Sequence, residues 1–334
     1  ENITFLPTLD PVENAIGYWD ASSNKDGTVI ASYKDSDDNG LYELYIGGVG
    51  EVYAPSWSAY LFQNFSSLVS FDSMNYFNTS NVTNMSYMFQ NCSVLSSIDV
   101  SGFDTSNVTS IAFMFSACKA LTNIDVADFN TKNLKSTLAA FNVCSKLMEL
   151  DLSKWNTSKN RSLSETFENC KSLIKLDIGN FDTSMVTDMG STFQGCSSLT
   201  SLAVSNFDTS KVTNFTGSNH DWDGIFASCT SLTSLDLSKW NTSNAVYMAN
   251  MFYNCKSLTE LDLSNFNTSK VTDMYNMFRR CSSLTMLNII NFDTSKVTNM
   301  SNMFNECNLL SSIDVSKFNT CLLYTSPSPR DYAA

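Results

Sequence analysis

The sequence predicts an α/β repeat fold, a right-handed leucine-rich-repeat-like solenoid in which each 26-residue turn contributes one short strand and one short helix. Three columns of residues indicate it. A cysteine recurs in steps of 26 residues, with one step of 33. Phenylalanine always lies three residues before this cysteine, and leucine always lies three residues after it. A fixed period in the twenties is typical of a solenoid, whose core grows with copy number. The cysteines that set the phase are Cys92, Cys118, Cys144, Cys170, Cys196, Cys229, Cys255, Cys281 and Cys307.

The strand of each turn is predicted six to eight residues after the cysteine. There, two aliphatic residues such as Leu150 and Leu152 flank one residue that is usually aspartate, here Asp151. This alternation has period two, so the aliphatic side chains should face the core and the aspartate should face outward. The strand ends at an aromatic residue such as Phe103.

The helix of each turn is predicted in the segment that runs from Val108 to Cys118. Its apolar residues are spaced by three, three, one and three, which fits a short amphipathic helix docked beside the strand. Thr105 and Ser106 precede the segment and are predicted to cap its free amides. The second architecture is a parallel β-helix without a helical segment, which this spacing disfavours.

The complete motif is Met-Phe-x-x-Cys-x-x-Leu-x-x-Leu-Asp-Leu-x-x-Phe-Asn/Asp-Thr-Ser-x-Val-Thr-x-Met. It resembles the branch of leucine-rich repeats found in the BspA-like bacterial surface proteins, and the resemblance extends over residues 59–320. The motif departs from common leucine-rich repeats by placing an aromatic residue where they carry Asn or Cys for a backbone-binding ladder. The resemblance implies a secreted or surface-anchored chain that often acts in adhesion. We therefore expect an extracellular, cell-surface location and partners among extracellular or host-surface proteins or glycans.

Three regions are predicted along the chain. Residues 1–58 lack the repeat, and their segments 28–34 and 41–47 read as strands joined through Asn39-Gly40, a strong hairpin signal. We expect an N-terminal β-hairpin cap there. Residues 59–320 should form about ten turns, of which the first is a degenerate terminal copy with Phe65 in the place of the cysteine.

The last region, residues 321–334, breaks the repeat abruptly after Thr320. The peptide from Cys321 to Asp331 resembles the in-frame translation of a sequencing-library adapter. We therefore expect a non-native tail and a natural protein that continues past Thr320.

The charge balance restricts the partners. The chain has 20 basic and 33 acidic residues, which gives a net charge of −13. A strongly negative chain is a poor ligand for nucleic acid, so we expect no nucleic-acid partner. No apolar run approaches the roughly 20 residues that span a bilayer, so we expect no membrane-spanning segment.

The nine repeat cysteines are predicted to stack as buried free thiols. In register, their Cβ atoms would lie about 4.8 Å apart, whereas a disulfide requires about 3.8 Å. Zinc is disfavoured because the chain has one histidine and no Cys-x-x-Cys pair. We expect no metal and no cofactor.

The outward strand position carries a line of aspartates, and these are the first predicted binding residues. Neighbouring charges about 5 Å apart repel by only about 0.8 kcal/mol in water, so the line can persist as a solvated face. The functional alternative is a strip for basic partner segments or weakly held divalent cations. The predicted binding members are Asp99, Asp125, Asp151, Asp177, Asp236 and Asp262, followed by Asp314 and interrupted by Ala203 and Asn288.

The step of 33 residues places seven extra residues between Asn214 and Gly224. An insertion in a solenoid must loop outward, often on a binding face. Its predicted binding residues are His220, Asp221, Trp222 and Asp223. An exposed tryptophan between two aspartates suits a sugar or a cationic side chain, although a tolerated surface loop is the simpler explanation of the insertion.

The sequence predicts a non-enzymatic adhesion or ligand-binding module, with the aspartate line and a nearby Trp222 as its contact surface. His220 has no neighbouring nucleophile at a recognisable spacing, and there is no Gly-x-Ser-x-Gly motif or phosphate-binding loop. We therefore expect no catalytic residues and no enzyme. The alternative is a polysaccharide-active enzyme, which requires the aspartate line or the insertion to hold a localised pair of carboxyl groups.

Overall fold

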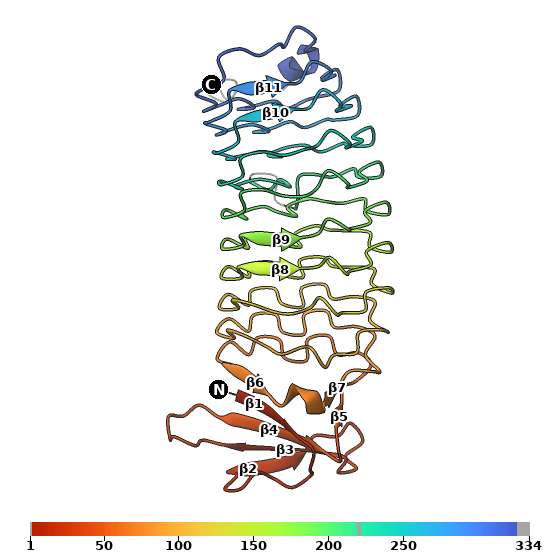
Figure 1. Cartoon of the computed structure of the whole chain (residues 1–334), viewed down its shortest axis with the longest axis vertical. Coiled ribbons are helices and arrows are strands. Elements are labelled where there is room, and N and C mark those ends of the chain that lie inside the picture. The colour runs from red at the N-terminus through yellow and green to blue at the C-terminus, as the bar shows by residue number, and fades with distance from the viewer. Residues whose placement is uncertain (1, 219–221, 326–334) are drawn as a thin grey trace, which may run out of the picture.

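The computed structural model describes residues 2–218 and 222–325, which wind into an elongated stack of similar turns (Figure 1). Parallel bridges join successive turns at the same phase, for example Ser110 to Ser136 and Tyr247 to Asp273. The stack runs straight along its long axis in this view, with the N-terminal sheet at one end. The chain is therefore a repeat solenoid, as the period predicts.

The N-terminal cap is a five-stranded sheet with the order β2-β3-β4-β1-β6. Strands β3 and β4 pair antiparallel, with Tyr33 opposite Leu44, so the predicted hairpin is present. Strand β1 pairs in parallel with both β4 and β6, and β6 already belongs to the degenerate first copy. The cap sheet thus continues into the array. Its strands are β1 (Asn2–Leu6), β2 (Gly17–Asp20), β3 (Val29–Lys34), β4 (Glu43–Gly48) and β6 (Ser70–Asp72).

Short elements complete the junction between the cap and the array. Strands β5 (Val52–Tyr53) and β7 (Phe77–Asn78) pair in parallel, and the 3-10 helix η1 (Met74–Tyr76) precedes β7. The ring of Phe5 in β1 stacks on that of Phe77 at 4.6 Å between centroids. The apolar core is therefore continuous from the cap into the first turns.

A column of phenylalanines forms the centre of the core. The rings of Phe89 and Phe115 lie 5.6 Å apart and 8° from parallel, and those of Phe252 and Phe278 lie 5.6 Å apart and 3° from parallel. Stacking continues through every turn from Phe62 to Phe304. The leucine column is buried beside it, with Leu147 fully inaccessible. Each turn therefore contributes the same apolar layer to one long core.

The predicted strand is present as β6 in the degenerate first copy and in four later turns, as β8 (Glu149–Asp151), β9 (Lys175–Asp177), β10 (Glu260–Asp262) and β11 (Met286–Asn288). These pair in parallel as β8 with β9 and β10 with β11. Leu150 is buried between the exposed side chains of Glu149 and Asp151. The alternation of aliphatic residues inward and aspartate outward is confirmed here. In the remaining turns this segment carries no assigned strand.

The predicted helix of each turn is wrong: within the described residues there is no α-helix. In the turn before Cys118, Phe113 and Ala117 have left-handed backbone, with φ of 58° and 60°. The amides of Met114 and Ser116 donate to carbonyls three residues earlier, as in consecutive β-turns. The amides of Phe113, Phe115 and Ala117 donate instead to the next turn of the array, at 2.7 to 2.9 Å.

Stacking geometry explains why turns replace the helix. An α-helix with its side chains is about 10 Å wide, whereas parallel strands repeat about every 4.8 Å. Helices on consecutive turns would force the stack to fan out, while a ribbon of β-turns keeps the spacing of the strands. In this respect the structure matches the β-helix alternative.

The Asp/Asn-Thr-Ser motif therefore does not cap a helix. Its threonine is buried and bridges two turns: Thr268 Oγ1 donates to the carbonyl of Asp293 at 2.9 Å and accepts the amide of Asp293 at 2.7 Å. The equivalent Thr294 makes the same pair of bonds to Asn319. A buried hydroxyl that serves both a donor and an acceptor explains why this column does not vary.

Replacing Thr268 with valine is expected to lower the free energy of unfolding by about 1–3 kcal/mol. Valine keeps the shape but leaves the amide and carbonyl of Asp293 without their buried partner. Thr268→Ser is the matched control, because it keeps the hydroxyl. Urea unfolding measures both variants, and equal stability of the two would contradict the bridging role.

The repeat cysteines form a hydrogen-bond ladder that the sequence analysis missed. Each thiol donates to the carbonyl of a core phenylalanine one turn earlier: Cys118 Sγ lies 3.1 Å from Phe89 O, and Cys281 Sγ lies 3.1 Å from Phe252 O. The cysteines are free in the structure, and those from Cys92 to Cys281 are buried. Common leucine-rich repeats carry a backbone-binding ladder at the position where this motif has an aromatic residue. In this chain the cysteine column supplies such a ladder instead.

The C-terminal segment begins with the 3-10 helix η2 (Cys321–Thr325). The rest of the predicted non-native tail, residues 326–334, lies outside the described residues.

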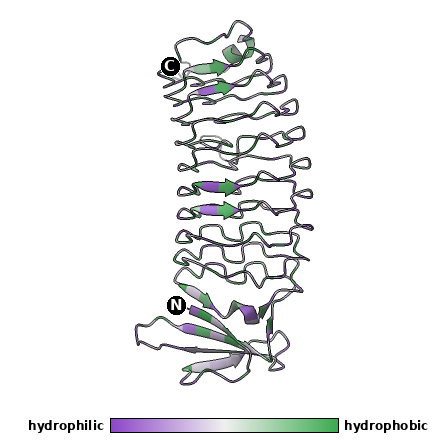
Figure 2. Cartoon of the chain, in the orientation of Figure 1, coloured by the Kyte–Doolittle hydropathy of each residue, from purple (hydrophilic) through white to green (hydrophobic). Residues whose placement is uncertain are grey.

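Hydrophilic and hydrophobic residues are interspersed along the turns (Figure 2). Among the described residues, no helix has the length and apolar character needed to cross a membrane.

Candidate binding surface

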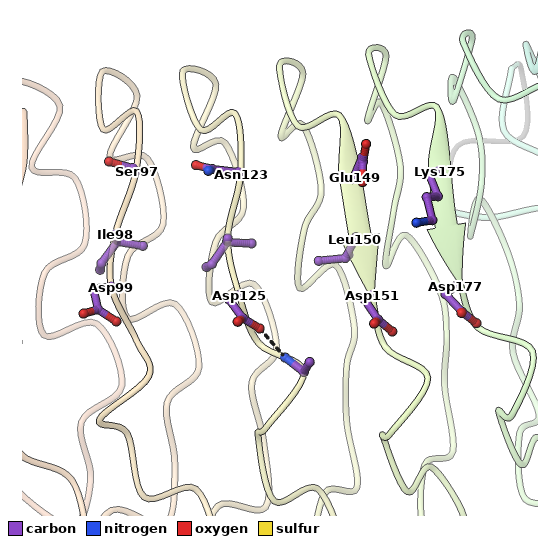
Figure 3. A pocket seen from close by; sticks show the side chains of 12 residues that line it. Ser97, Ile98, Asp99, Asn123, Asp125, Glu149, Leu150, Asp151, Lys175 and Asp177 are labelled. Atoms are coloured by element: carbon purple, nitrogen blue, oxygen red, sulfur yellow. Dashed lines mark hydrogen bonds between the residues drawn. The ribbon is translucent and has the colours of Figure 1, made fainter.

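The six aspartates predicted as binding residues, called the aspartate strip below, are all exposed on one face of the array. Figure 3 shows four of them, Asp99, Asp125, Asp151 and Asp177, at the same position of successive turns. Ala203 interrupts the line, and Asp236 and Asp262 continue it beyond this gap. The structure therefore brings the predicted aspartates into one line with two segments.

Each aspartate of the strip also ends its strand segment with a local turn. The amide of Ser101 donates to Asp99 Oδ1 at 2.9 Å, and the amide of Ser153 donates to Asp151 Oδ1 at 2.9 Å. Such turns explain the residue type in local structural terms. The backbone amides in these turns bind Oδ1 of the aspartate, and the carboxylate group remains exposed at the surface.

Hydrogen bonds keep the strip charged. The serine two residues further along lowers the pKa of Asp99, Asp151 and Asp236, mainly through its side chain and then through its amide. For Asp262 the amide of the serine has the larger effect and its side chain the smaller. A carboxylate that accepts hydrogen bonds is favoured in its ionised form. These four members of the strip are therefore anionic at neutral pH.

An open groove of about 650 Å³ follows the first segment of the strip. Besides the four aspartates, Glu149 and Lys175 line it and lie opposite each other in β8 and β9. Ile98 and Leu150 also line the groove, with their side chains largely buried (Figure 3). A second groove of about 600 Å³ follows β10 and β11 and includes Asp262. Both grooves can receive an extended ligand that carries positive charge.

The strip contains no ready-made metal centre. Among residues 2–218 and 222–325, no group of three or more histidine, cysteine, aspartate or glutamate side chains is placed to hold a metal ion. The side chains that converge on the groove include the ammonium of Lys175 as well as carboxylates. The surface is better suited to cationic side chains than to a single chelated ion.

The amides and carbonyls of the β-turns that precede each cysteine join successive turns of the array, and these hydrogen bonds are called the turn ladder below. The insertion takes the place of one residue in this ladder. The amide of Ser191 donates to Thr216, 25 residues ahead, whereas the amide of Phe193 donates to Ile225, 32 residues ahead. Between Thr216 and Ile225 the chain therefore has eight residues where other turns have a single left-handed one. The amide of Ile225 donates to Phe215 O at 2.8 Å and closes the base of the insertion.

The described part of the insertion contacts the turn ladder. Trp222 is half exposed, and its ring lies 5.6 Å from that of Tyr253, which belongs to the turn ladder. No described residue of the insertion lines either groove. The structure therefore does not place Trp222 in either groove, and its nearness to the rest of the strip stays a prediction. Asp223 is 8% exposed, and His220 and Asp221 lie outside the described residues.

A group of carboxyls beside the insertion was missed by the sequence analysis. Glu165, Glu168 and Asp188 are half-buried, and burial is the main cause that raises the pKa of each. The negative charges of Glu165 and Asp223 add to the effect on Glu168, whose pKa rises to about 7. The sequence signal was glutamate at two ladder positions of one turn, where the other turns carry uncharged residues or, once, Arg279.

One family model matches most of the chain. Its description is "Mycoplasma protein of unknown function, DUF285", and it matches residues 58–175, 135–219, 161–261 and 220–325. These overlapping stretches cover the array, in keeping with its repeats. No curated protein sequence matches the chain.

Two solved structures are similar to parts of the chain. The "Crystal structure of TLR13-ssRNA13 complex" shares 17% identity, covers 72% of this chain and 34% of that chain, and has a TM-score of 0.29. The "Functional domain of InlJ from Listeria monocytogenes includes a cysteine ladder" shares 14% identity, covers 66% of this chain and 62% of that chain, and has a TM-score of 0.16. The chain thus spans about a third and about three fifths of these two proteins. The fold assignment rests on the repeat geometry described above.

Proposed function

Because the chain belongs to the DUF285 family, whose description names no activity, we propose its function from its own surface: a non-enzymatic ligand-binding or adhesion module. In this proposal the protein is secreted or exposed on a cell surface and binds extracellular or host-surface proteins or glycans. The observation that carries the proposal is the aspartate strip, an exposed line of ionised carboxylates along open grooves.

The chemistry of the strip selects a cationic partner. One carboxylate per turn at a pitch of about 4.8 Å offers many equivalent contacts to an extended segment rich in lysine or arginine. Each exposed ion pair is worth little, but linked contacts add up through their effective concentration. Salt screens such contacts over about 10 Å at 0.1 M, so the binding should weaken with ionic strength. The BspA-like resemblance of the repeat motif supports the surface location and the adhesive role.

We expect that replacing the four aspartates of the first groove with asparagine lowers affinity at least about tenfold at low salt, since each lost contact costs a few tenths of a kcal/mol or more. The measurement is a binding screen of the chain against extracellular-matrix proteins and glycans at two salt concentrations. Asparagine retains the local turn, so the fold should be unaffected. The changed residues are Asp99, Asp125, Asp151 and Asp177.

A second aspartate column supplies the matched control. Its members accept the amide of a serine two residues on, as Asp104 does from Ser106 at 2.9 Å, but they do not line the groove. Changing four of them removes the same charge from another part of the turn. Equal loss in both variants, or binding that ignores salt, would contradict recognition by the strip. The control residues are Asp104, Asp182, Asp208 and Asp293.

The carboxyl group beside the insertion favours a second candidate, a polysaccharide-active enzyme. Glu168, with its pKa raised to about 7, has the protonation behaviour of a general acid, and Asp223 and the exposed ring of Trp222 lie in the same region. A polysaccharide-cleavage assay run beside the binding screen separates the two candidates. Products that vanish in Glu168→Gln and persist in the strip variant would favour the enzyme.

A further inference from the structure

The loop between β3 and β4 holds the one Asn-Gly pair of the sequence, Asn39-Gly40. Both residues are exposed, and Gly40 has left-handed backbone with φ of 79°. An added Cβ at Gly40 would meet no atom within 4 Å, so the space beside its backbone is open. Glycine itself carries no Cβ that would hinder a close approach of its nitrogen to another group. The pair therefore offers an accessible nucleophile directly after a side-chain amide.

Three hydrogen bonds surround the two groups that would react. The amide of Gly40 donates to Asp35 Oδ2 at 2.9 Å. The amide of Leu41 donates to Asn39 Oδ1 at 2.7 Å, and Asn39 Nδ2 donates to Asp37 Oδ2 at 2.9 Å. The bond from Leu41 bends the Asn39 side chain toward the backbone that follows it, as in an Asx turn. The loop thus places a carboxylate on the proton of the nucleophile and a donor on the carbonyl oxygen under attack.

These positions correspond to the parts of an acyl-transfer site. A peptide nitrogen is a weak nucleophile, because its lone pair is delocalised into the carbonyl group, so it needs a base to take its proton. Asp35 lies at hydrogen-bond distance for that step. The amide of Leu41, 2.7 Å from Asn39 Oδ1, can hold the negative charge that develops on this oxygen when a nitrogen adds to the carbonyl carbon.

We propose that Asn39-Gly40 is a self-modifying site, at which Gly40 N attacks Asn39 Cγ and the asparagine becomes aspartate or isoaspartate. The N–Cγ bond forms while the Gly40 proton passes to Asp35 Oδ2. The Cγ–Nδ2 bond then breaks, and ammonia leaves with that proton, so a cyclic imide remains. Water, the only co-reactant, opens the imide at either carbonyl and leaves one additional carboxylate. No group is oxidised or reduced.

A neighbouring loop supplies an internal comparison. Gly27 follows Asp26 between β2 and β3, and its amide donates to Asp20 Oδ2 at 2.9 Å. The amide of Thr28 donates to Asp26 Oδ1 at 3.1 Å, so these hydrogen bonds repeat the arrangement around Asn39. The group under attack is here a carboxylate, whose negative charge repels a nucleophile, and hydrogen bonds with Thr28 lower the pKa of Asp26. We therefore expect no isoaspartate at Asp26.

Peptide mapping by mass spectrometry tests the site on the full chain, incubated at neutral pH either folded or in denaturant. Asn39 should convert at least about tenfold faster in the folded chain, because only there do Asp35 and Leu41 contact the reacting groups. Isoaspartate should appear beside aspartate, since water can open the imide at both carbonyls. Equal or slower conversion in the folded chain would overturn the proposal, because the pair would then react without help from the loop.

Two variants of the same loop identify the base. Asp35→Asn keeps an oxygen that accepts the Gly40 amide but cannot take its proton, so conversion in the folded chain should fall about tenfold or more. The rate in denaturant should not change. Ser36→Ala is the matched control, because it removes only the hydrogen bond from Ser36 Oγ to Glu43 Oε2 at 2.7 Å, and it should convert at the original rate. Folded Asp35→Asn that converts as fast as Ser36→Ala would reject Asp35 as the base and this site with it.

Discussion

Replacing Phe167 with alanine is expected to lower the free energy of unfolding by about 3–5 kcal/mol. Its ring is fully buried and stacks on those of Phe141 at 6.1 Å and Phe193 at 5.8 Å. Alanine removes the ring and leaves a cavity in a core that is continuous through the array. The turns on either side cannot close the gap, because their hydrogen bonds to each other set the spacing. Urea unfolding followed by circular dichroism measures the loss.

A matched variant separates this effect from the loss of any aromatic residue. Phe65 occupies the position of the cysteine in the degenerate first copy and is 43% exposed. Phe65→Ala should cost about 1 kcal/mol or less, in the range of ordinary surface changes. If Phe167→Ala cost no more than Phe65→Ala, the continuous phenylalanine column would not be the main source of stability.

The repeat cysteines are expected to resist alkylation in the folded chain by at least about a thousandfold relative to an ordinary exposed thiol. Burial raises the pKa of Cys92, Cys170 and Cys229 to about 12, so almost no reactive thiolate is present at pH 8. Each thiol is also held against a carbonyl of the core, as Cys170 is against Phe141. Cys321 is exposed and should be labelled at once.

Counting thiols in the folded and unfolded chain tests this expectation. Without reductant, all ten cysteines should become reactive in denaturant, and prior reduction should not raise the count. Thiols that appear only after reduction would mean that disulfides replace the hydrogen-bond ladder. Cys307 is half-exposed at the end of the array and serves as an internal control, since it should react before Cys170 and after Cys321.

The comparison of Val108–Cys118 with the structure explains the error over the helix. Apolar spacings of three and four fit a helix, but they also fit consecutive β-turns that bury every third or fourth side chain. The two structures differ in the carbonyls to which the amides donate. The amide of Phe115, for example, donates to the carbonyl of Ala140 in the next turn. That choice depends on a neighbouring turn at strand spacing, which the local pattern does not contain.

The carboxyls beside the insertion illustrate the same limit for the candidate site. Glu165 and Glu168 lie more than two turns of sequence before Asp223. Seven extra residues predict a loop, but they do not predict which way it folds. Only the structure shows that Ser218 contacts Glu165 of an earlier turn while Trp222 lies against Tyr253 of a later one.

The sequence by itself determined the solenoid, its period, the phenylalanine and leucine columns, the outward aspartates and the hairpin within the cap. These features follow from the need to bury the same apolar side chains in every turn. The nine copies of the repeat show that pattern nine times. The tertiary structure decided the rest: β-turns instead of helices, threonine and cysteine as bridges between turns, and the contact of the insertion with Glu165. The physical reason is that each of these depends on hydrogen bonds or charges between turns, whose partners lie 25 or more residues apart and become neighbours only when the turns stack.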